Sequence, residues 1–462
     1  MLRIDRVSRV LRVGVWFVTF AACGFPRPQN VAECTSSPDC KSPGAPICVN
    51  DECVSACQVN DDCQRSPGAP FCQVSSGACV GCLDGTSCPT DNQVCDASEH
   101  SCRSCMRDDE CPGGICVEAD GTCVADASVV FVDGSGVNSG TCTRDAPCSL
   151  AFGLSKASAV RKHIEIVSGT LQVTSSVTLT PDLYIEGHDT IVTGPAGMFT
   201  LPQNVNITLS HMRLQPSSGL VTTVDALRTL RLFDVQTSGG INVNGGVLDV
   251  DLSTFTGGGG IACNLGTSTV RRSLFDHSPM SSMTCQLIVR RSRFDMSGDH
   301  GFSAENGVLT FENNVITQTE GIADSMVLVS VAPGSTVRFS TFVNTALLPS
   351  DGVALACNSS VDVSSNIFAY GSMHPLGTVG CNVRYSLYDS IAVPEVTAGV
   401  GNKAAGSSSF FIDKAGKDFH LSPSSPARGA AESGLGVSED FDGAARPSPA
   451  GSQPDMGAFE AR

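Results

Sequence analysis

Val270-Arg271-Arg272-Ser273-Leu274-Phe275-Asp276 and, nineteen residues further on, Val289-Arg290-Arg291-Ser292-Arg293-Phe294-Asp295 are two copies of one repeating unit. The same shape, a short polar pair followed by an aromatic or aliphatic residue, recurs from Met212 to Tyr388. The residues that mark it are Leu214, Val235, Phe255, Phe275, Phe294, Val315, Phe342, Phe368 and Tyr388, at steps of 21, 20, 20, 19, 21, 27, 26 and 20 residues. A self-similar unit of this length is typical of a solenoid.

Each unit is built from short stretches that alternate apolar and polar residues. Val247-Leu248-Asp249-Val250-Asp251 and Val361-Asp362-Val363 are examples, and Gly, Ser and Asn clusters separate such stretches. No unit carries a helical period, and the leucine-rich consensus is absent. Coils of roughly twenty residues fit a parallel β-helix, in which successive coils stack about 4.8 Å apart. The marker residues then form an inward hydrophobic column, and the two longest units predict loops near 343–352 and 369–380 that would wall any groove.

The composition limits the partners. The chain has 462 residues, a net charge of −17 and a pI near 4.8, which excludes nucleic acid as a partner. Anionic membranes and uronic-acid polymers would also be repelled unless cations or a local basic patch intervene. A hydrophobic content of 41% suffices for one large core plus a smaller module.

The N-terminus has the pattern of an export signal. Four arginines within the first twelve residues precede the apolar segment Val13–Ala22, which is too short to span a bilayer. It ends in Phe20-Ala21-Ala22-Cys23, which resembles a bacterial lipobox with Phe in place of the usual Leu. The resemblance implies a signal peptide over 1–22, a lipid on Cys23 and a linker over 23–33. The implied location is the outer membrane or cell surface, or a periplasm-facing membrane; the alternative is plain secretion with Cys23 as a spare thiol.

Residues 34–124 form a cysteine-rich module of four repeats. Each repeat begins with the spacing C-x5-C, and an apolar residue precedes each third cysteine. Units this short cannot bury a core, so two disulfides in each are expected to hold them together. Cys79-x2-Cys82 and Cys102-x2-Cys105 also match zinc-ribbon spacing, but the fourfold repeat already explains every cysteine. The module resembles Dickkopf N-terminal-type repeats of bacterial surface proteins, which implies a stalk or an interaction module.

Residues 125–420 are expected to form the β-helix. A strand over Val129–Gly134 precedes a helix from Asp145 to about Arg161 that would cover the open end of the solenoid. With the following Ile164–Thr170 coil, the segment resembles the right-handed parallel β-helix of the pectate-lyase-like superfamily, an all-β fold. The remaining cysteines are predicted to form disulfides: Cys263 with Cys285 and Cys357 with Cys381, each about one coil apart, and Cys142 with Cys148 beside the helix.

Residues 421–462 resemble the tail of bacterial choice-of-anchor Q proteins. The resemblance begins at Phe419-His420-Leu421 and continues through Ser425-Pro426-Ala427, Asp440-Phe441-Asp442-Gly443, Arg446-Pro447 and Asp455-Met456-Gly457-Ala458-Phe459-Glu460. The Asp that usually follows Ser-Pro-Ala is replaced by Arg428.

The catalytic hypothesis comes from the fold by analogy. A lyase of this fold needs clustered carboxylates to hold Ca²⁺ and an Arg or Lys as the base. The nearest candidates are the paired positions Arg272, Asp276, Arg291 and Asp295, which would equally form a surface ion-pair ladder. An inverting hydrolase needs carboxylates roughly 6.5–9.5 Å apart, wider than adjacent coils allow. The histidines show no ligand spacing, and Asp299-His300-Gly301 fits a turn.

Three functions therefore compete. The preferred one is a lipid-anchored envelope protein whose β-helix binds glycans or protein partners without catalysis. The alternatives are a polysaccharide lyase or glycoside hydrolase, and a structural spacer. No catalytic residue, metal site or cofactor is assigned, and Ca²⁺ is expected only for the lyase.

Overall fold

The computed structural model describes residues 34–461 apart from 41–46, 51, 55, 85–86, 89–93, 112–113, 168, 297–300, 319–324, 346–352, 373 and 378–379. The predicted signal peptide, Cys23 and the linker therefore lie outside the described residues, as do Asp299 and His300. The chain divides into two compact units, residues 1–90 with 94–103 and residues 91–93 with 104–462. The fourth cysteine repeat thus belongs to the same unit as the β-helix.

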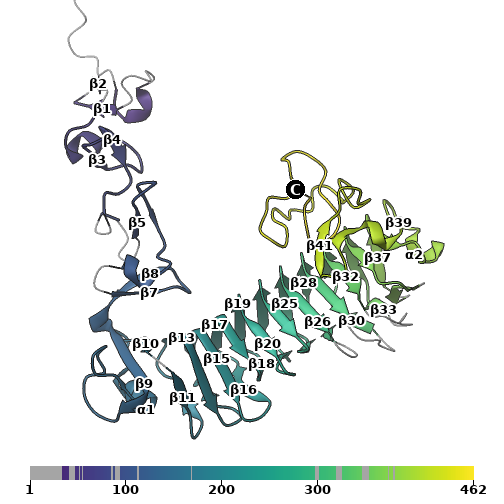
Figure 1. Ribbon diagram of the computed structural model, residues 1–462, viewed down its shortest axis with the longest axis horizontal. Coiled ribbons are helices and arrows are strands. Elements are labelled where there is room, and N and C mark those ends of the chain that lie inside the picture. The colour runs from purple at the N-terminus through teal and green to yellow at the C-terminus, as the bar shows by residue number, and fades with distance from the viewer. Residues whose placement is uncertain are drawn as a thin grey trace, which may run out of the picture. The chain divides into compact units, whose positions relative to one another are not determined.

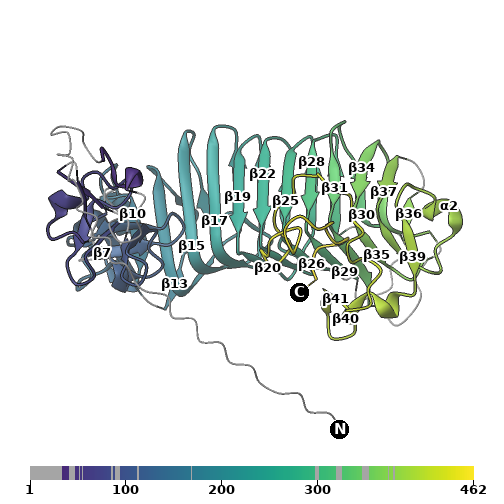
Figure 2. The same cartoon turned by 90° about the horizontal axis from the view of Figure 1, so that it is seen from above.

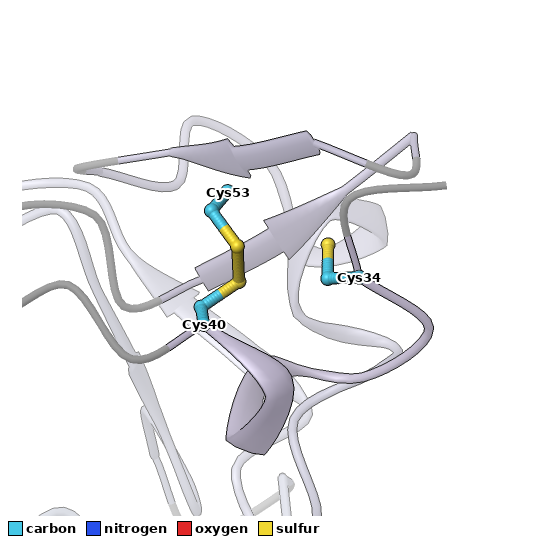
Figure 3. Close-up of side chains that lie close together, drawn as sticks. All are labelled: Cys34, Cys40 and Cys53. Carbon is cyan, nitrogen blue, oxygen red and sulfur yellow. A yellow bond between two sulfur atoms is a disulfide. The ribbon is translucent and has the colours of Figure 1, made fainter. Parts of the chain in front are cut away.

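The first unit contains three cysteine repeats, each with one antiparallel hairpin. The hairpins are β1 (Ile47–Val49) with β2 (Glu52–Val54), β3 (Phe71–Gln73) with β4 (Ala78–Val80), and β5 (Val94–Asp96) with β6 (Ser101–Arg103). The first cysteine bonds the third, as in Cys34–Cys48, and the second bonds the fourth, as in Cys40–Cys53, the disulfide drawn in Figure 3. Cys79 and Cys82, which zinc-ribbon spacing would group together, belong to different disulfides.

In three of the four repeats an acidic residue, Asp39, Asp62 or Glu110, precedes the second cysteine and closes a turn in the same repeat. The carboxylate of Asp39 accepts hydrogen bonds from the backbone amides of Thr35 (2.8 Å) and Ser36 (2.9 Å), and Asp62 does the same for Gln58. Hydrogen bonds from Thr35 and Ser36 lower the pKa of Asp39 to about 2. The recurring acid is therefore a capping residue of the disulfide module.

The second unit is a parallel β-helix, as predicted (Figure 1). Its first sheet runs through β9 (Val129–Val137), β10 (His163–Ile166), β13 (Leu183–Gly194), β15 (Val205–Pro216), β17 (Arg228–Thr237), β19 (Val247–Asp251), β22 (Thr267–Arg271), β25 (Gln286–Arg290), β28 (Leu309–Glu312), β31 (Thr336–Arg338), β34 (Val361–Ser364) and β37 (Cys381–Arg384). The fourth repeat, with β7 (Gly114–Val117) and β8 (Thr122–Ala125), packs Ile115 against Val129 and Phe131 of β9.

The other two sheets complete each coil. The second sheet contains β11 (Thr170–Gln172), the later halves of β13, β15 and β17, then β20 (Thr254–Thr256), β23 (Leu274–Asp276), β26 (Arg293–Met296), β29 (Val315–Gln318), β32 (Thr341–Asn344), β35 (Ile367–Ala369), β38 (Leu387–Asp389) and β39 (Lys403–Ala405). The third contains β16 (Leu220–Asp225), β18 (Gly240–Asn244), β21 (Ile261–Cys263), β24 (Met280–Met283), β27 (Phe302–Glu305), β30 (Ser325–Ser330), β33 (Val353–Cys357) and β36 (Leu376–Gly377). A separate pair joins β12 (Val177–Thr178) and β14 (Phe199–Thr200).

The predicted hydrophobic column is present, with two corrections. Aromatic rings stack from coil to coil, with centroid distances of 4.8 Å between Phe255 and Phe275 and 4.7 Å between Phe275 and Phe294. The register places Thr237 rather than Val235 beneath Phe255, and Ile316 rather than Val315 above Phe294. An alignment on hydrophobic residues misses Thr237, which is buried. In the coil that contains Asn313-Asn314 it selects Val315, which faces outward, instead of Ile316.

A polar ladder beside the column explains the conserved shape of the repeat unit. Between the first and second sheets each coil turns at a left-handed residue, such as Arg272 (φ 47°) or Arg291 (φ 52°). From Ser253 onward the next residue is a Ser or Asn, buried except at Asn402, whose oxygen accepts the backbone N–H of the equivalent residue one coil earlier. The links run from Ser253 N to Ser273 Oγ (3.1 Å), and onward through Ser292, Asn314, Ser340, Asn366, Ser386 and Asn402. The ladder satisfies buried amides that would otherwise be costly.

The cap helix is shorter than predicted. Helix α1 spans Leu150–Lys156, with Ser149 as its N-cap, and the extended backbone of Ala157 ends it. The Cys142–Cys148 disulfide fixes the preceding loop, so no helical turn forms at residue 145. Gly153 packs so closely on β9 that an added Cβ would lie 2.5 Å from Val132 Cγ1, which places the helix on the first strand of the solenoid. Cys263–Cys285 and Cys357–Cys381 join successive coils.

The C-terminal tail packs on the outer face of the second sheet near its end (Figure 2). After α2 (Pro394–Thr397) and β39, the strands β40 (Phe411–Asp413) and β41 (Asp418–Leu421) form a hairpin. A second hydrophobic cluster joins outward residues of the sheet, including Ile367 and Leu387, to Phe419, Met456 and Phe459 of the tail. The backbone also docks, since Gly457 N donates to Ser365 O (2.8 Å). The motif residues of the tail are thus part of a packed structure.

One contact within the tail predicts a pH dependence. The ring of His420 contacts Asp418 (2.6 Å) and Asp442 (2.8 Å); burial lowers its pKa, but these two carboxylates outweigh burial and raise it above 6.5. Because the folded pKa lies above the unfolded value, the stabilisation is complete below pH 6.5 and is lost as the pH rises through the folded pKa. We expect limited proteolysis of the tail to be faster at pH 9 than at pH 6, and His420→Gln to remove most of that difference. An equal pH response in both chains would contradict this assignment.

Candidate functional site

The candidate catalytic face consists of Arg272, Asp276, Arg291 and Asp295. Among the described ion pairs, none joins two of these four residues. Arg272 binds Asp251 of the preceding coil (Nε–Oδ1 2.8 Å), whereas Arg291 binds the tail through Glu439 Oε2 (2.8 Å) and Phe441 O (3.0 Å). Asp276 contacts only its neighbour His277 among the described ion pairs. The predicted ladder is therefore wrong in its pairing, because Arg272 pairs with Asp251 and Arg291 pairs with Glu439.

Asp295, the fourth residue of that face, is covered by the tail. Asp276 and Asp295 are register neighbours on adjacent coils, as predicted. Asp295 accepts a hydrogen bond from Arg293 (2.9 Å), contacts Thr317, and lies 3.5 Å from the ammonium of Lys417. Its side chain is 14% exposed. Burial raises its pKa, yet the bonds from Arg293 and Thr317 outweigh burial and hold the pKa below its usual value. Asp295 is thus an ionised structural carboxylate.

A cavity of about 700 Å³ lies at the C-terminal end of the β-helix. Strands β36 and β37 and the segment 393–402 line it, so it includes part of the second long loop that the sequence predicted as a groove wall; residues 346–352 of the first loop lie outside the described part of the chain. Its walls combine the apolar side chains of Val393 and Val400 with the amides of Asn382 and Asn402. The lining residues also include His374, Leu376, Gly377, Cys381, Val383, Arg384 and Gly399.

One cationic group at this cavity is firmly held. Arg384 donates from Nε to Glu432 Oε2 (2.6 Å) and contacts Asp362 through its other nitrogens. The hydrogen bond with Asp362 raises the pKa of Arg384 further above its ordinary value. The guanidinium is therefore a fixed donor at a mixed polar and apolar cavity.

A second polar cluster lies where the fourth cysteine repeat meets the first coils. Asp108 of the short 3-10 helix η3 (Asp108–Glu110), Glu165 of β10 and His188 of β13 bring one ligand atom each within 4.8 Å of the others. Glu165 is buried and contacts His188 Nε2, while one oxygen of Asp108 accepts the amide of Cys116 (2.9 Å). A carboxylate, a second carboxylate and an imidazole are a ligand set that divalent metals use.

Further titratable groups extend this cluster. Nδ1 of His211 lies 2.9 Å from Asp234 Oδ2, and its buried Nε2 lies 3.1 Å from Glu118 and 3.7 Å from Glu186. Burial, reinforced by the charge of Glu165, raises the pKa of Glu186 to about 8. The hydrogen bond with Glu165 raises the pKa of His188 to about 9. His188, His211, Glu118 and Asp234 also line a cleft of about 500 Å³.

Sequence reasoning missed this cluster although part of its signal was present. Glu165 and Glu186 are 21 residues apart, and His188, His211 and Asp234 follow one another at intervals of 23 residues, each about one coil. Local ligand spacing cannot detect such groups, whereas a search at the solenoid period could. Nothing in the sequence indicated that Asp108 and Glu118 would reach them from the cysteine repeat.

Among the described residues, no helix has the length and apolarity needed to cross a membrane. Neither a family model nor a curated protein matches this chain. Among solved structures, the pectate lyase Pel9A aligns over 73% of this chain and 100% of its own at 13% identity, with a TM-score of 0.30. That value is too low to add to an argument about fold or function, so the assignment as a parallel β-helix preceded by a disulfide-rich region stands on the strand register and the bonded cysteines.

Proposed function

We propose that this chain is an exported, lipid-anchored cell-surface protein whose β-helix binds a glycan or a protein partner without chemical turnover. The sequence pattern over residues 1–23 supports export and attachment of the lipid at Cys23. The 22 cysteines other than Cys23 take part in 11 disulfides, a usage typical of oxidising compartments outside the cytoplasm. In this proposal the lipid on Cys23 attaches the chain to the membrane.

The observation that carries the binding proposal is the cavity at the end of the β-helix. Its volume of about 700 Å³ falls within the range of roughly 300–1,000 Å³ that is usual for ligand pockets. Asn402 Oδ1 accepts Ser386 N and Asn382 Nδ2 donates to Ser360 Oγ, and each amide has a further hydrogen and lone pair that suit hydroxyl groups or a peptide backbone. The valines supply apolar contact, and the guanidinium of Arg384, held by Asp362 and Glu432, gives the polar wall a fixed geometry.

The catalytic alternative is weaker because its candidate side chains already have partners. Arg291 and Asp295 contact the tail, and Arg272 is paired with Asp251. A general base must reach the proton that it removes, and an arginine held in an ion pair within its own chain is poorly placed for that.

We expect a bulky side chain in the cavity to reduce binding. Val400 lines the cavity and is 71% exposed, so Val400→Trp should fill the space without disturbing the core. Val160→Trp, at a position that is 80% exposed near α1, is the matched control. Retention of the purified chain would be measured on arrays of neutral polysaccharides, acidic polysaccharides and envelope proteins. Val400→Trp should weaken any retention about tenfold or more, a loss of at least 1.4 kcal/mol, while Val160→Trp leaves it unchanged. Equal retention by both variants would refute this location.

A further inference from the structure

The His188 cluster brings four carboxyl groups together with two imidazoles, and the charge of Arg144 also acts on Asp108 and Glu165. Asp108, Glu118, Glu165 and Glu186 converge from the fourth repeat and from two adjacent coils, and Glu165 and Glu186 are direct register neighbours on β10 and β13. Only the two imidazoles of His188 and His211 face them among the described ion pairs. Buried carboxylates normally have cationic partners or coordinate a metal.

The cluster holds one buried nitrogen without a hydrogen bond, beside a buried carboxyl group. The Glu186 side chain is 7% exposed, and its one ion-pair contact among the described residues is with His211 Nε2 at 3.7 Å, beyond hydrogen-bond distance. That same Nε2 is buried and has no hydrogen-bond partner within the part of the chain that the structure describes. Nδ1 of the ring meanwhile contacts Asp234, the carboxylate–histidine arrangement that orients imidazoles in metal sites. His211 Nε2 lies 3.1 Å from Glu118 and 3.7 Å from Glu186, without a hydrogen bond to either.

We propose that Asp108, Glu165 and His188 bind a divalent transition-metal ion. Glu165 comes from a rigid strand, and a hydrogen bond from Cys116 N already fixes one oxygen of Asp108. His188 is half exposed, so the site has an open side through which an ion can enter. The ion would fasten the fourth cysteine repeat to the first coils of the β-helix.

The ligand atoms select the class of ion. Ca²⁺ and Mg²⁺ take oxygen ligands almost exclusively, whereas an imidazole nitrogen beside carboxylates suits ions such as Zn²⁺ and Mn²⁺. The disulfide-bonded cysteines of the fourth repeat, Cys105–Cys116 and Cys111–Cys123, do not provide thiolates. We therefore expect one equivalent of Zn²⁺ or Mn²⁺, with Ca²⁺ bound at least tenfold more weakly.

Calorimetric titration of the full chain with Zn²⁺, Mn²⁺ and Ca²⁺ tests the site. Asp108→Asn retains an oxygen that can accept the Cys116 amide while removing the charge, and His188→Gln removes the nitrogen ligand. Loss of one residue that only hydrogen-bonds to a metal ligand weakens metal binding by roughly 10–100-fold. Because each variant changes a ligand itself, each should weaken metal binding by about a hundredfold or more. His277→Gln is the matched control, because His277 also contacts a carboxylate, Asp276 Oδ1 at 2.6 Å, yet belongs to no three-ligand group among the described residues. Cys23 is present in every variant, so any metal that it binds contributes equally to each titration and does not affect the comparison.

A second readout follows the structural role of the ion. Chelation should speed amide hydrogen exchange over residues 105–123 in the wild-type chain, and Asp108→Asn should show the faster exchange already without chelator. One equivalent of tightly bound Zn²⁺ or Mn²⁺ that His188→Gln loses and His277→Gln keeps supports the site. No stoichiometric binding, equal affinity in the two histidine variants, or Ca²⁺ binding as tight as Zn²⁺ overturns it.

Discussion

Replacing Arg446 by Ala should destabilise the C-terminal tail by about 3–5 kcal/mol, because it leaves a buried carboxylate without its partner. Arg446 donates to the carbonyl oxygens of Asp455 (2.7 Å) and Gly457 (3.0 Å) and lies 3.2 Å from Glu460, with both side chains only 1% exposed. Its guanidinium also stacks over the ring of Phe339, 4.3 Å from the centroid. Burial lowers the pKa of Arg446 to about 10, against the opposing charge of Glu460, so the group is ionised at neutral pH.

Hydrogen exchange over residues 440–461 measures this loss directly. Arg428→Ala is the control, because Arg428 is an exposed arginine of the same tail and should leave the protection unchanged. Arg446→Met combined with Glu460→Gln should recover part of the loss, since neither buried charge is then left unpaired. Protection in Arg446→Ala that equals that of Arg428→Ala would show that the tail is held by its hydrophobic contacts alone.

Replacing Phe275 by Ala should cost about 3–5 kcal/mol, because the ring fills the middle of the aromatic column. Phe275 is fully buried and stacks on Phe255 below and Phe294 above at nearly parallel angles of 2° and 10°. Its removal opens a cavity between two coils whose backbones are fixed by the Ser273 ladder. The coils cannot close over the gap without breaking that ladder.

Chemical denaturation combined with hydrogen exchange in β20, β23 and β26 tests the second prediction. Each coil of a solenoid contacts mainly its neighbours, so the loss of protection should be concentrated in these strands. Phe275→Leu, which keeps much of the volume, should cost about 1 kcal/mol. A loss below 1 kcal/mol for Phe275→Ala would mean that the column does not stabilise these coils.

The repeat made the fold predictable because its chemistry is local to each coil. A buried Ser or Asn at the turn and an inward aromatic two residues later, as in Ser273 and Phe275, must recur at the coil length. The prediction failed where the inward residue was Thr237, and where Val315 was chosen although Ile316 is the second residue after the ladder residue Asn314. Hydrophobicity alone does not identify a threonine that faces the core.

The sites were less predictable because they depend on contacts between distant segments. Arg291 and Asp295 were singled out correctly as neighbouring charged positions, yet their partners Glu439 and Lys417 lie more than a hundred residues further along the chain. Asp108 reaches Glu165 and His188 only because Ile115 packs on β9. No periodic pattern in the sequence predicts these contacts between distant segments.

Product analysis tests most directly whether this β-helix binds without turnover. The full chain would be incubated with the polysaccharides that retain it, once with Ca²⁺ and Zn²⁺ and once with chelator, and the release of unsaturated and reducing ends would be followed. We predict retention without new ends under either condition. Metal-dependent or metal-independent release of such ends would contradict the proposal and identify the chain as a lyase or a hydrolase.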